Sequence, residues 1–366
     1  DDAGRRWEDG GVNVENVRLP RAVPPLFLPR STLRLTGRAM ELQPDVFHLF
    51  KPKAYSGLAH WRLDCLPPTY SGRIVVDADD WECPGGWNDV ADYTPLEKRF
   101  FSWQERWGLT HADTVTVASR TLESLVWSLG VPQERVFYVP NGNAGVVDNG
   151  WASGGRGNWI LLYTRFFEFS LRRVMAVFLQ VREFLPEARL LIVGKGLSGE
   201  EDRFLQLAAD AGLEVGELPS ARRQDSISRV GNQGYPSDGL DVAYAGWVPA
   251  ERLPGLFAWA KVAIYPFDDT LVNRAKCAVK LVDLLAAGVP VVAEDVGQNR
   301  EYIQRGATGL LVAPGDTTAF AEAIVRLWQD AGLRAKLGGA ASRDIRERFA
   351  WEKLAGTVER AYGVGA

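Results

Sequence analysis

The chain has 366 residues, a formal net charge of -4 and 46% hydrophobic residues. This length is enough for two domains with separate cores, and the charge gives no global reason to expect a nucleic-acid partner. The three cysteines are scattered outside CxxC spacing and the three histidines form no HExxH-type cluster. The sequence therefore favours a reducing, cytoplasmic setting over a disulfide framework or a zinc site, and no apolar run is long enough to cross a membrane.

The N-terminal segment is rich in arginine. Residues 1–16 are polar and Gly-rich and predict a loop. Between Val17 and Met40 the chain carries five arginines and no acidic residue, with proline and Leu or Phe between them. This pattern favours a solvated face over a partly buried segment, and the alternative is a phospholipid surface contacted by residues 18–38. Because the chain starts with Asp and no strand-like run precedes Phe47, we expect a first strand to be missing upstream.

Short apolar strands then alternate with helical segments. The expected strands are 46–50, 74–76, 114–118 and 136–139. An amphipathic, Trp-rich helix is expected at 95–109, and Ser119 is a natural N-cap for another helix that ends near Leu129. Alternation of this kind predicts an open parallel sheet with crossover connections.

Charged residues follow the first two of these strands. Lys51 and Lys53 come after the first strand, and Asp79 and Asp80 come after the second. The carboxyl ends of parallel strands line the ligand crevice of open α/β sheets, so the lysines could meet an anionic acceptor or could simply be solvated. The DxD tripeptide that ends at Asp79 could hold a divalent metal. A DxD tripeptide is more often a solvated strand end or a helix cap, so no metal is predicted. A third possibility is that Asp79 or Asp80 is an acceptor-site carboxylate.

A second series of strands and helices starts after a Gly-rich linker at 149–158. The expected strands are 159–163, 188–193, 242–245 and 262–265, and the expected helices are 171–184, 200–212, 250–260, 317–329, 333–349 and 351–362. The polar stretch 214–240 is predicted to be a long, mobile insertion. The predicted domains are 1–149, 150–345 and a C-terminal helix, 346–366, that crosses back to the first domain.

The stretch 273–302, NRAKCAVKLVDLLAAGVPVVAEDVGQNREY, is the most informative part of the second series. Its spacing predicts a helix that ends at a glycine, followed by a buried strand. Lys276 and Lys280 lie at the helix N-terminus, where free N–H groups predict an anion site. Asp283 lies one turn further and could accept hydrogen bonds from a sugar hydroxyl. Phosphate and hydroxyl recognised together indicate a nucleotide or a sugar phosphate.

Two further motifs follow strands of the second half. Arg165 follows the strand at 159–163, and a charge-assisted hydrogen bond from it to a phosphate would contribute about 1.5–3 kcal/mol. Residues 194–199 match GxGxxG. A dinucleotide fingerprint should follow the first strand of its unit, and these residues follow the second. We therefore expect a glycine loop that lets the backbone approach a ligand, and not an NAD site.

Together these segments resemble a family-4 glycosyltransferase of the GT-B fold (glycosyl transferases group 1). The resemblance rests on WILLYTRF, LPEARLLIVGKG, VAYAGWVPAERLPGLFAWAKVAIYPF, KLVDLLAAGVPVVAEDVGQNREYI and GATGLLVAPGD, and in the first half on TVTVASRTLESLV. It implies an α/β protein with two Rossmann-like parallel-sheet domains that face a cleft, the first for the acceptor and the second for the donor.

The resemblance also implies an activity. It implies a retaining hexosyltransferase that moves a sugar from a GDP- or UDP-linked donor to a sugar, lipid-linked or other hydroxyl acceptor, in glycan or glycolipid synthesis. No metal and no cofactor besides the donor substrate is expected. The expected location is the cytoplasm or the inner face of the membrane.

Individual residues take roles from the same resemblance. Arg165 and Lys280 would be catalytic, because they would stabilise the donor diphosphate. Asp283 takes the place of the family's second glutamate, which binds the ribose hydroxyls. The expected donor-binding residues are Asp283, Lys276, Gly194, Gly196, Val279 and Gln298. The expected acceptor-side residues are Lys51, Lys53, Asp79 and Asp80.

The chain departs from the family pattern at two positions. The family's lysine would fall near Ser170, and Arg172 or Arg173 would replace it. The family's first glutamate, which contacts the transferred sugar, falls at Lys276 and reverses the charge. Three alternatives therefore stay open: a nucleotide-sugar 2-epimerase of the same fold, a non-catalytic relic that binds nucleotide sugar, and a dehydrogenase that uses the GKGLSG loop.

Overall fold

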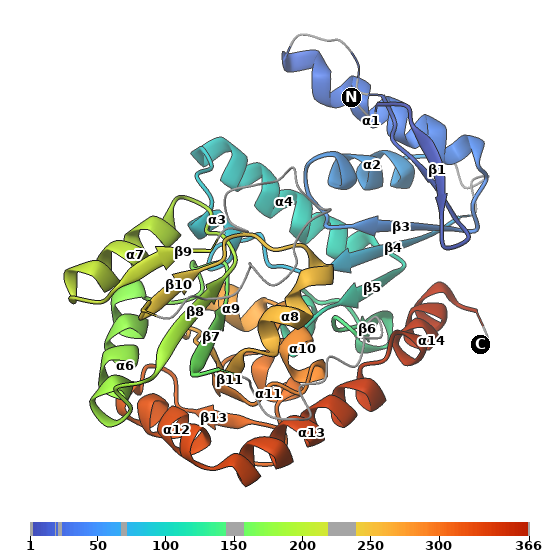
Figure 1. Cartoon of the computed structure of the whole chain (residues 1–366). Helices are drawn as coiled ribbons and strands as arrows, with labels where there is room; N and C mark the ends of the chain where they lie inside the picture. The colour runs from blue at the N-terminus through green and yellow to red at the C-terminus, as the bar shows by residue number, and fades with distance from the viewer. Residues whose placement is uncertain are drawn as a thin grey trace. The chain divides into compact units, whose positions relative to one another are not determined.

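The computed structural model describes residues 3–18, 20, 24–66, 72–143, 157–218 and 239–364 (Figure 1). The chain forms two compact units, one made of Asp1–Pro140 with Ala355–Ala366, the other of Asn141–Leu354. The predicted linker lies almost entirely outside the described residues, and so does most of the predicted insertion at 214–240.

Unit 1 is built on a four-stranded parallel sheet with the strand order β3-β4-β5-β6. Its strands are β3 (Val46–Phe50), β4 (Arg73–Ala78), β5 (Thr114–Val117) and β6 (Val136–Tyr138). Its helices are α1 (Pro24–Glu41), α2 (Ala54–Asp64), α3 (Trp87–Val90), α4 (Pro95–His111), α5 (Arg120–Ser128) and the part of α14 (Trp351–Tyr362) from Ala355 onward. The valines of β4 and β5 are fully buried, as a parallel sheet covered on both faces requires.

The predicted loop at residues 1–16 is wrong. Strands β1 (Arg6–Asp9) and β2 (Val12–Glu15) form an antiparallel hairpin there. Gly10 and Gly11 connect them, and both have positive φ, as the two central residues of a tight hairpin turn must. The helix α1 was not expected either, because its arginines interrupt the apolar spacing.

Two contacts attach the last helix to unit 1. The Tyr362 hydroxyl lies 2.7 Å from Nδ1 of His48 on β3, and Thr114 Oγ1 donates to the carbonyl oxygen of Ala361 over 2.8 Å. Ser119 caps α5 as predicted, because its side chain accepts a hydrogen bond from the Leu122 amide.

Unit 2 contains a seven-stranded parallel sheet with the strand order β13-β12-β11-β7-β8-β10-β9. The strands are β7 (Trp159–Tyr163), β8 (Arg189–Val193), β9 (Val215–Glu217), β10 (Val242–Tyr244), β11 (Ala260–Tyr265), β12 (Val291–Glu294) and β13 (Leu310–Val312). The edge strand β9 corrects the expectation that residues from 214 onward belong to an insertion. The fold class, α/β with two parallel sheets, is confirmed.

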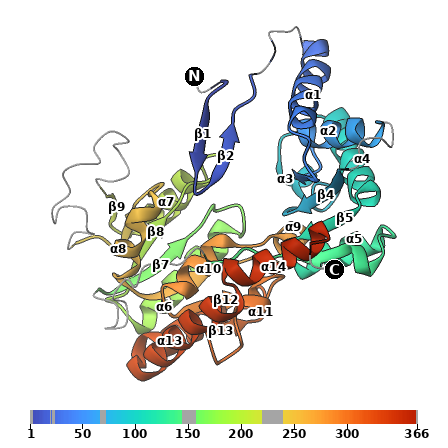
Figure 2. The ribbon, with the colours of Figure 1, turned by 90° about the vertical axis from the view of Figure 1, so that its right-hand side faces the viewer.

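Helices cover this sheet. They are α6 (Leu171–Phe184), α7 (Glu200–Asp210), α8 (Leu253–Phe257), α9 (Leu271–Ala275), α10 (Val279–Ala286), α11 (Asn299–Tyr302), α12 (Thr317–Gln329) and α13 (Ala331–Arg348). Ile160 and Leu162 of β7 belong to a core shared with α6, α7 and α12. Helices α10 and α13 pack against each other (Figure 2). Within the described ranges, no helix has both the length and the apolar character that a membrane span needs.

Candidate functional site

The turn after β7 is organised by Glu168, whose side chain is 2% exposed. Its Oε2 accepts hydrogen bonds from Thr164 Oγ1 (3.1 Å) and from the backbone N–H of Arg165 (3.2 Å). Phe166 has a positive φ of 67°, and its N–H donates to Thr164 Oγ1 over 2.8 Å. The Arg165 guanidinium donates through Nε to the carbonyl oxygen of Lys195 (3.1 Å). Hydrogen bonds therefore hold both the backbone and the guanidinium of Arg165.

Lys276 reaches this turn from the loop between α9 and α10. Its Nζ lies 2.5 Å from Glu168 Oε1 and 4.4 Å from the centroid of the Phe167 ring. The reversed charge at position 276 is therefore compensated inside the protein. Sequence reasoning missed Glu168, and its available signal was a lone carboxylate within the aromatic run Phe166 to Phe169.

Lys280 lies in the first turn of α10, next to Lys276 in space. Burial, and then the positive charge of Lys276, lower its pKa to about 8. Among the described residues no ion pair with Lys280 is found; its Nζ lies 5.1 Å from the centroid of the Tyr163 ring. The N-cap residue, Ala278, offers no side-chain cap to the helix. A lysine without a carboxylate partner at an uncapped helix N-terminus is an anion-binding arrangement.

Asp283 lies one turn after Lys280 on the same helix. Burial raises its pKa to about 6, and the charge of Lys280 opposes that rise. Burial, together with the charge of Asp283, also raises the pKa of Tyr163 at the end of β7. The structure thus brings Asp283, Lys280 and the β7 turn together, and it adds Tyr163 to the group.

The glycine loop after β8 approaches the same turn. Gly194 has a φ of 125°, and a Cβ there would lie 1.9 Å from the carbonyl oxygen of Thr164, so glycine is needed. The Gly196 amide donates to Glu201 Oε2 (2.9 Å), and the Ser198 amide donates to Glu200 Oε2 (2.7 Å). Because carboxylates already accept these amides, the loop is poorly suited to hold a dinucleotide pyrophosphate.

The arginine expected to replace the family lysine is used differently. Arg173 pairs with Asp268 and with the fully buried Glu294, each at 2.6 Å. Two carboxylates therefore surround its guanidinium. Of the two candidates, Arg172 is the one with an exposed side chain.

Val279 and Gln298 border the site in different ways. Val279 is the first residue of α10 and is half exposed, whereas Gln298 is buried before α11. Gly297 precedes Gln298 with a φ of 49°, and a Cβ there would lie 2.5 Å from the Arg274 backbone. The loop conformation therefore depends on glycine, while the donor contacts of Val279 and Gln298 stay predictions.

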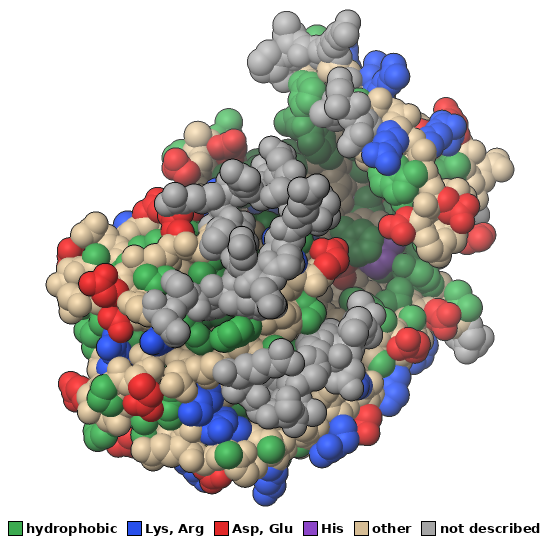
Figure 3. Space-filling view, viewed as in Figure 1, with side chains coloured by type: hydrophobic (Ala, Val, Ile, Leu, Met, Phe, Trp, Pro, Cys, Tyr) green, Lys and Arg blue, Asp and Glu red, His purple; other side chains and the backbone are tan. Residues whose placement is uncertain are grey.

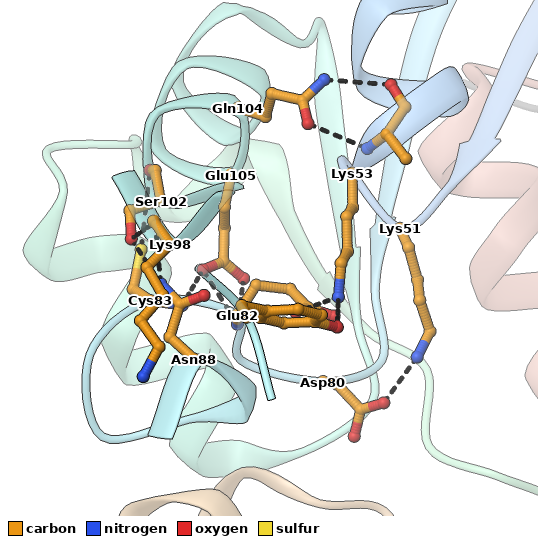
Figure 4. Close-up of polar contacts among 12 residues, drawn as sticks. Lys51, Lys53, Asp80, Glu82, Cys83, Asn88, Lys98, Ser102, Gln104 and Glu105 are labelled. Carbon is orange, nitrogen blue, oxygen red and sulfur yellow. Dashed lines mark hydrogen bonds and ion pairs between the residues drawn. The ribbon is translucent and has the colours of Figure 1, made fainter. Parts of the chain in front are cut away.

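In unit 1 three of the four predicted acceptor-side residues, Lys51, Asp79 and Asp80, pair with one another, and Figure 4 shows the contact between Lys51 and Asp80. Lys51 Nζ lies 2.6 Å from Asp80 Oδ2 and 3.5 Å from Asp79 Oδ1. Lys51 and Ala54, at the two ends of the connection between β3 and α2, both have positive φ. The charge of Lys51 is therefore neutralised within unit 1.

Lys53 is also paired. Its Nζ lies 2.7 Å from Glu82 Oε2 and 2.5 Å from the Tyr93 hydroxyl (Figure 4). Glu105 on α4 is fully buried and accepts hydrogen bonds from the Glu82 and Cys83 amides, so it fixes the loop that carries Glu82. Burial raises the pKa of Glu105 to about 7. Sequence reasoning missed Glu82 and Tyr93, because the segment between β4 and α4 has no regular spacing, and it missed Glu105, whose hydrogen-bond partners lie 22 and 23 residues earlier in the chain.

The two parallel sheets define a two-unit α/β protein in which Arg165, Lys276 and Lys280 lie near one another beside β7 and α10. Family models match both halves: "Glycosyl transferase 4-like domain" matches residues 1–142 and "Glycosyl transferases group 1" matches residues 160–330. The chain belongs to the group 1 glycosyl transferases, as the sequence predicted. Among the described residues, no group of three or more His, Cys, Asp or Glu side chains could hold a metal ion.

Curated relatives align over short segments. A phosphatidyl-myo-inositol mannosyltransferase from Mycobacterium leprae is 37% identical over 84 residues, which are 23% of this chain and 22% of the relative. An N-acetyl-alpha-D-glucosaminyl L-malate synthase from Bacillus anthracis is 34% identical over 92 residues, 25% of this chain and 24% of the relative. The chain thus spans about a quarter of the length of the curated relatives it matches.

Solved structures share the fold over most of the chain. A sucrose-phosphate synthase from Thermosynechococcus elongatus superposes with a TM-score of 0.69 at 21% identity, covering 98% of this chain and 84% of the other. Anabaena HepE in complex with UDP and glucose gives a TM-score of 0.64 at 16% identity, covering 94% and 84%. These likenesses confirm the predicted GT-B fold class.

Proposed function

We propose that the chain is a retaining glycosyltransferase that moves a sugar from a GDP- or UDP-linked donor to a hydroxyl acceptor. The observation that carries the proposal is Lys280, for which no ion pair is found among the described residues and which lies at the start of α10, where no side chain caps the helix. The charge of Arg165 acts on Lys280, so the two cations lie near one another. A diphosphate would fill the place between them.

The chemistry follows from the leaving group. As the bond between the sugar and the diphosphate breaks, negative charge develops on the phosphate oxygens. Arg165, Lys280 and the first amides of α10 would stabilise that charge, and this electrostatic contribution is usually the largest in catalysis. The acceptor hydroxyl would attack from the face that the leaving group departs from, and a donor phosphate oxygen would take its proton. Asp283 would hold the ribose hydroxyls.

The contact between Lys276 and Glu168 supports activity despite the reversed charge at position 276. The family places a carboxylate in this loop, and here a carboxylate lies 2.5 Å from the lysine that replaces it. We therefore propose that Glu168 and Lys276 act together at the sugar end of the donor, with Gly194, Gly196, Val279 and Gln298 around the rest of it.

Unit 1 would serve the acceptor. Lys51, Lys53, Asp79 and Asp80 are the proposed acceptor-side residues. Because both lysines already contact carboxylates, a hydroxyl-bearing acceptor is favoured over a strongly anionic one. The acceptor would be a sugar or a lipid-linked molecule, with residues 18–38 at the inner face of a membrane. On the face shown in Figure 3, acidic and basic side chains are interspersed around α1 and the hairpin, so this contact would be weak.

Nucleotide release from GDP- and UDP-sugars tests the proposal. We expect Arg165→Ala and Lys280→Ala each to lower kcat/KM by about 100-fold or more, as the loss of a group that stabilises developing charge does. Lys261→Ala is a matched control, because Lys261 is a half-buried lysine of the same unit that also lies over an aromatic ring. Turnover like wild type in both variants would contradict the assignment. Product analysis separates transfer from 2-epimerisation, which needs no acceptor.

A further inference from the structure

The exposed side of α4 carries a continuous row of apolar and aromatic side chains. Leu96, Phe100, Trp103, Trp107 and His111 recur every three or four residues and so lie along one stripe of the helix. Neighbouring rings stack, with centroid distances of 5.9 Å (Phe100 to Trp103), 6.1 Å (Trp103 to Trp107) and 4.4 Å (Trp107 to His111). We call these five residues the α4 stripe.

The α4 stripe is separate from the side of the helix that packs in unit 1. That inner side is formed by the buried residues Gln104, Glu105, Gly108 and Leu109. In the stripe, Leu96 is 78% exposed and Trp103 is 42% exposed. Trp107 contacts His60 of α2 with a centroid distance of 4.9 Å, which anchors the stripe toward the C-terminal end of α4. A contiguous apolar surface of this kind on a water-soluble face marks an interaction site.

The charges beside the α4 stripe are positive. Arg99 and Arg106 are exposed, and they lie four positions before and three positions after Trp103, so both flank its ring. The two carboxylates of α4 are engaged elsewhere. Glu97 closes the capping box with Thr94, and Glu105 is buried on the inner side. The exposed side of α4 is therefore aromatic and cationic, with its single exposed carboxylate at the first turn.

We propose that the α4 stripe binds an anionic lipid surface. Trp103 and Phe100 would enter the headgroup region, where amphipathic rings are favoured, and Arg99 and Arg106 would contact lipid phosphates. This inference does not depend on the proposed sugar transfer. It also differs from the membrane contact through residues 18–38, because Arg38 there is already paired with Glu15 and Glu41.

Vesicle co-sedimentation of the full chain tests the proposal. The probes are vesicles of phosphatidylcholine alone and of phosphatidylcholine with one third phosphatidylglycerol. We expect binding to the anionic vesicles only, with an apparent partition coefficient that falls about tenfold for Trp103→Ser. For Arg99→Gln and for Arg106→Gln we expect the partition coefficient to fall about fivefold each. This fall is equivalent to about 1 kcal/mol per basic residue near an anionic surface.

Matched controls lie in unit 2. Trp247→Ser removes an indole that is 63% exposed, and Arg343→Gln with Arg346→Gln removes two exposed arginines of α13. These variants should bind like wild type. Because the arginine variants change only exposed side chains, they keep the test valid if Trp103→Ser unfolds the unit.

Unchanged vesicle binding in the stripe variants overturns the proposal. Loss of vesicle binding only in the double variant Arg30→Gln with Arg34→Gln would assign the membrane contact to α1. A stripe variant that changes only the oligomeric state would assign a protein partner instead.

Discussion

Each unit has two lysines beside its parallel sheet. Three of the four contact a carboxylate, whereas no ion pair with Lys280 is found among the described residues. In unit 1, Lys51 and Lys53 each contact a carboxylate within 2.7 Å. In unit 2, Lys276 contacts Glu168 in the same manner, but Lys280 has no such contact among the described residues. Carboxylates raise the pKa of Lys51, whereas burial and neighbouring cations lower the pKa of Lys280 to about 8.

This difference separates three lysines whose charge is neutralised inside the protein from Lys280, the proposed ligand of the donor diphosphate. A paired lysine has already exchanged water for a carboxylate, so a phosphate must compete for it. A half-buried lysine beside other cations is destabilised in its charged form, and an incoming diphosphate removes that cost. Lys280, the lysine for which no ion pair is found among the described residues, is thus the best evidence for a diphosphate site.

The largest effect should follow from breaking the pair between Lys276 and Glu168. Lys276→Met leaves the carboxylate of Glu168 buried without its cation, which costs about 3 kcal/mol of unfolding free energy. Hydrogen exchange of unit 2 peptides in a urea series would measure the loss. Adding Glu168→Gln removes the stranded charge, so the double variant should recover part of the stability. If the double variant is less stable than Lys276→Met, the unpaired charge of Glu168 is not the reason for the loss of stability.

Lys53 and Lys51 allow a comparison within unit 1. Lys53 is 18% exposed and its partner Glu82 is nearly buried, whereas Lys51 is 42% exposed. We expect Lys53→Gln to cost about 2 kcal/mol and Lys51→Gln less than about 1 kcal/mol, because solvent screens the more exposed pair. Peptides of unit 1 in the same exchange series would measure both. Equal losses would mean that burial does not decide the strength of these pairs.

The sequence predicted the elements of the sheets well and their contacts less well. Alternating apolar strands and helix caps such as Ser119 are local signals, so the α/β class, the strands β3 to β8 and β10 to β12, and the helix α10 could be predicted. The hairpin β1–β2 was missed because two glycines provide its main signal. Strand β9 was missed because it lies at the edge of a polar stretch.

The residues of the candidate site could be predicted only where a motif carries them. Lys280 and Asp283 lie in a regular helix whose spacing is visible in the sequence. Glu168, Glu82 and Glu105 act through partners that are far away in the chain, such as Lys276 for Glu168. No local pattern encodes such pairs, so the neutralisation of Lys276 could be found only in three dimensions.

The most specific prediction concerns the pH dependence of nucleotide binding. The pKa of Lys280 in the folded protein, about 8, lies below its ordinary value, so the free protein loses this proton as the pH rises through 8. A bound diphosphate favours the charged lysine and would retain the proton. The affinity for UDP should therefore fall about tenfold between pH 7 and pH 9, equivalent to about 1.4 kcal/mol. Calorimetric titration with UDP in buffers of different ionisation enthalpy would measure both the affinity and the proton uptake.

In Lys280→Gln the fall in UDP affinity between pH 7 and pH 9 should disappear. Lys51→Gln should keep this fall, because Lys51 stays charged throughout this range. A wild-type pH profile in Lys280→Gln would mean that another group binds the phosphate, and the contrast between the two units would lose its functional meaning.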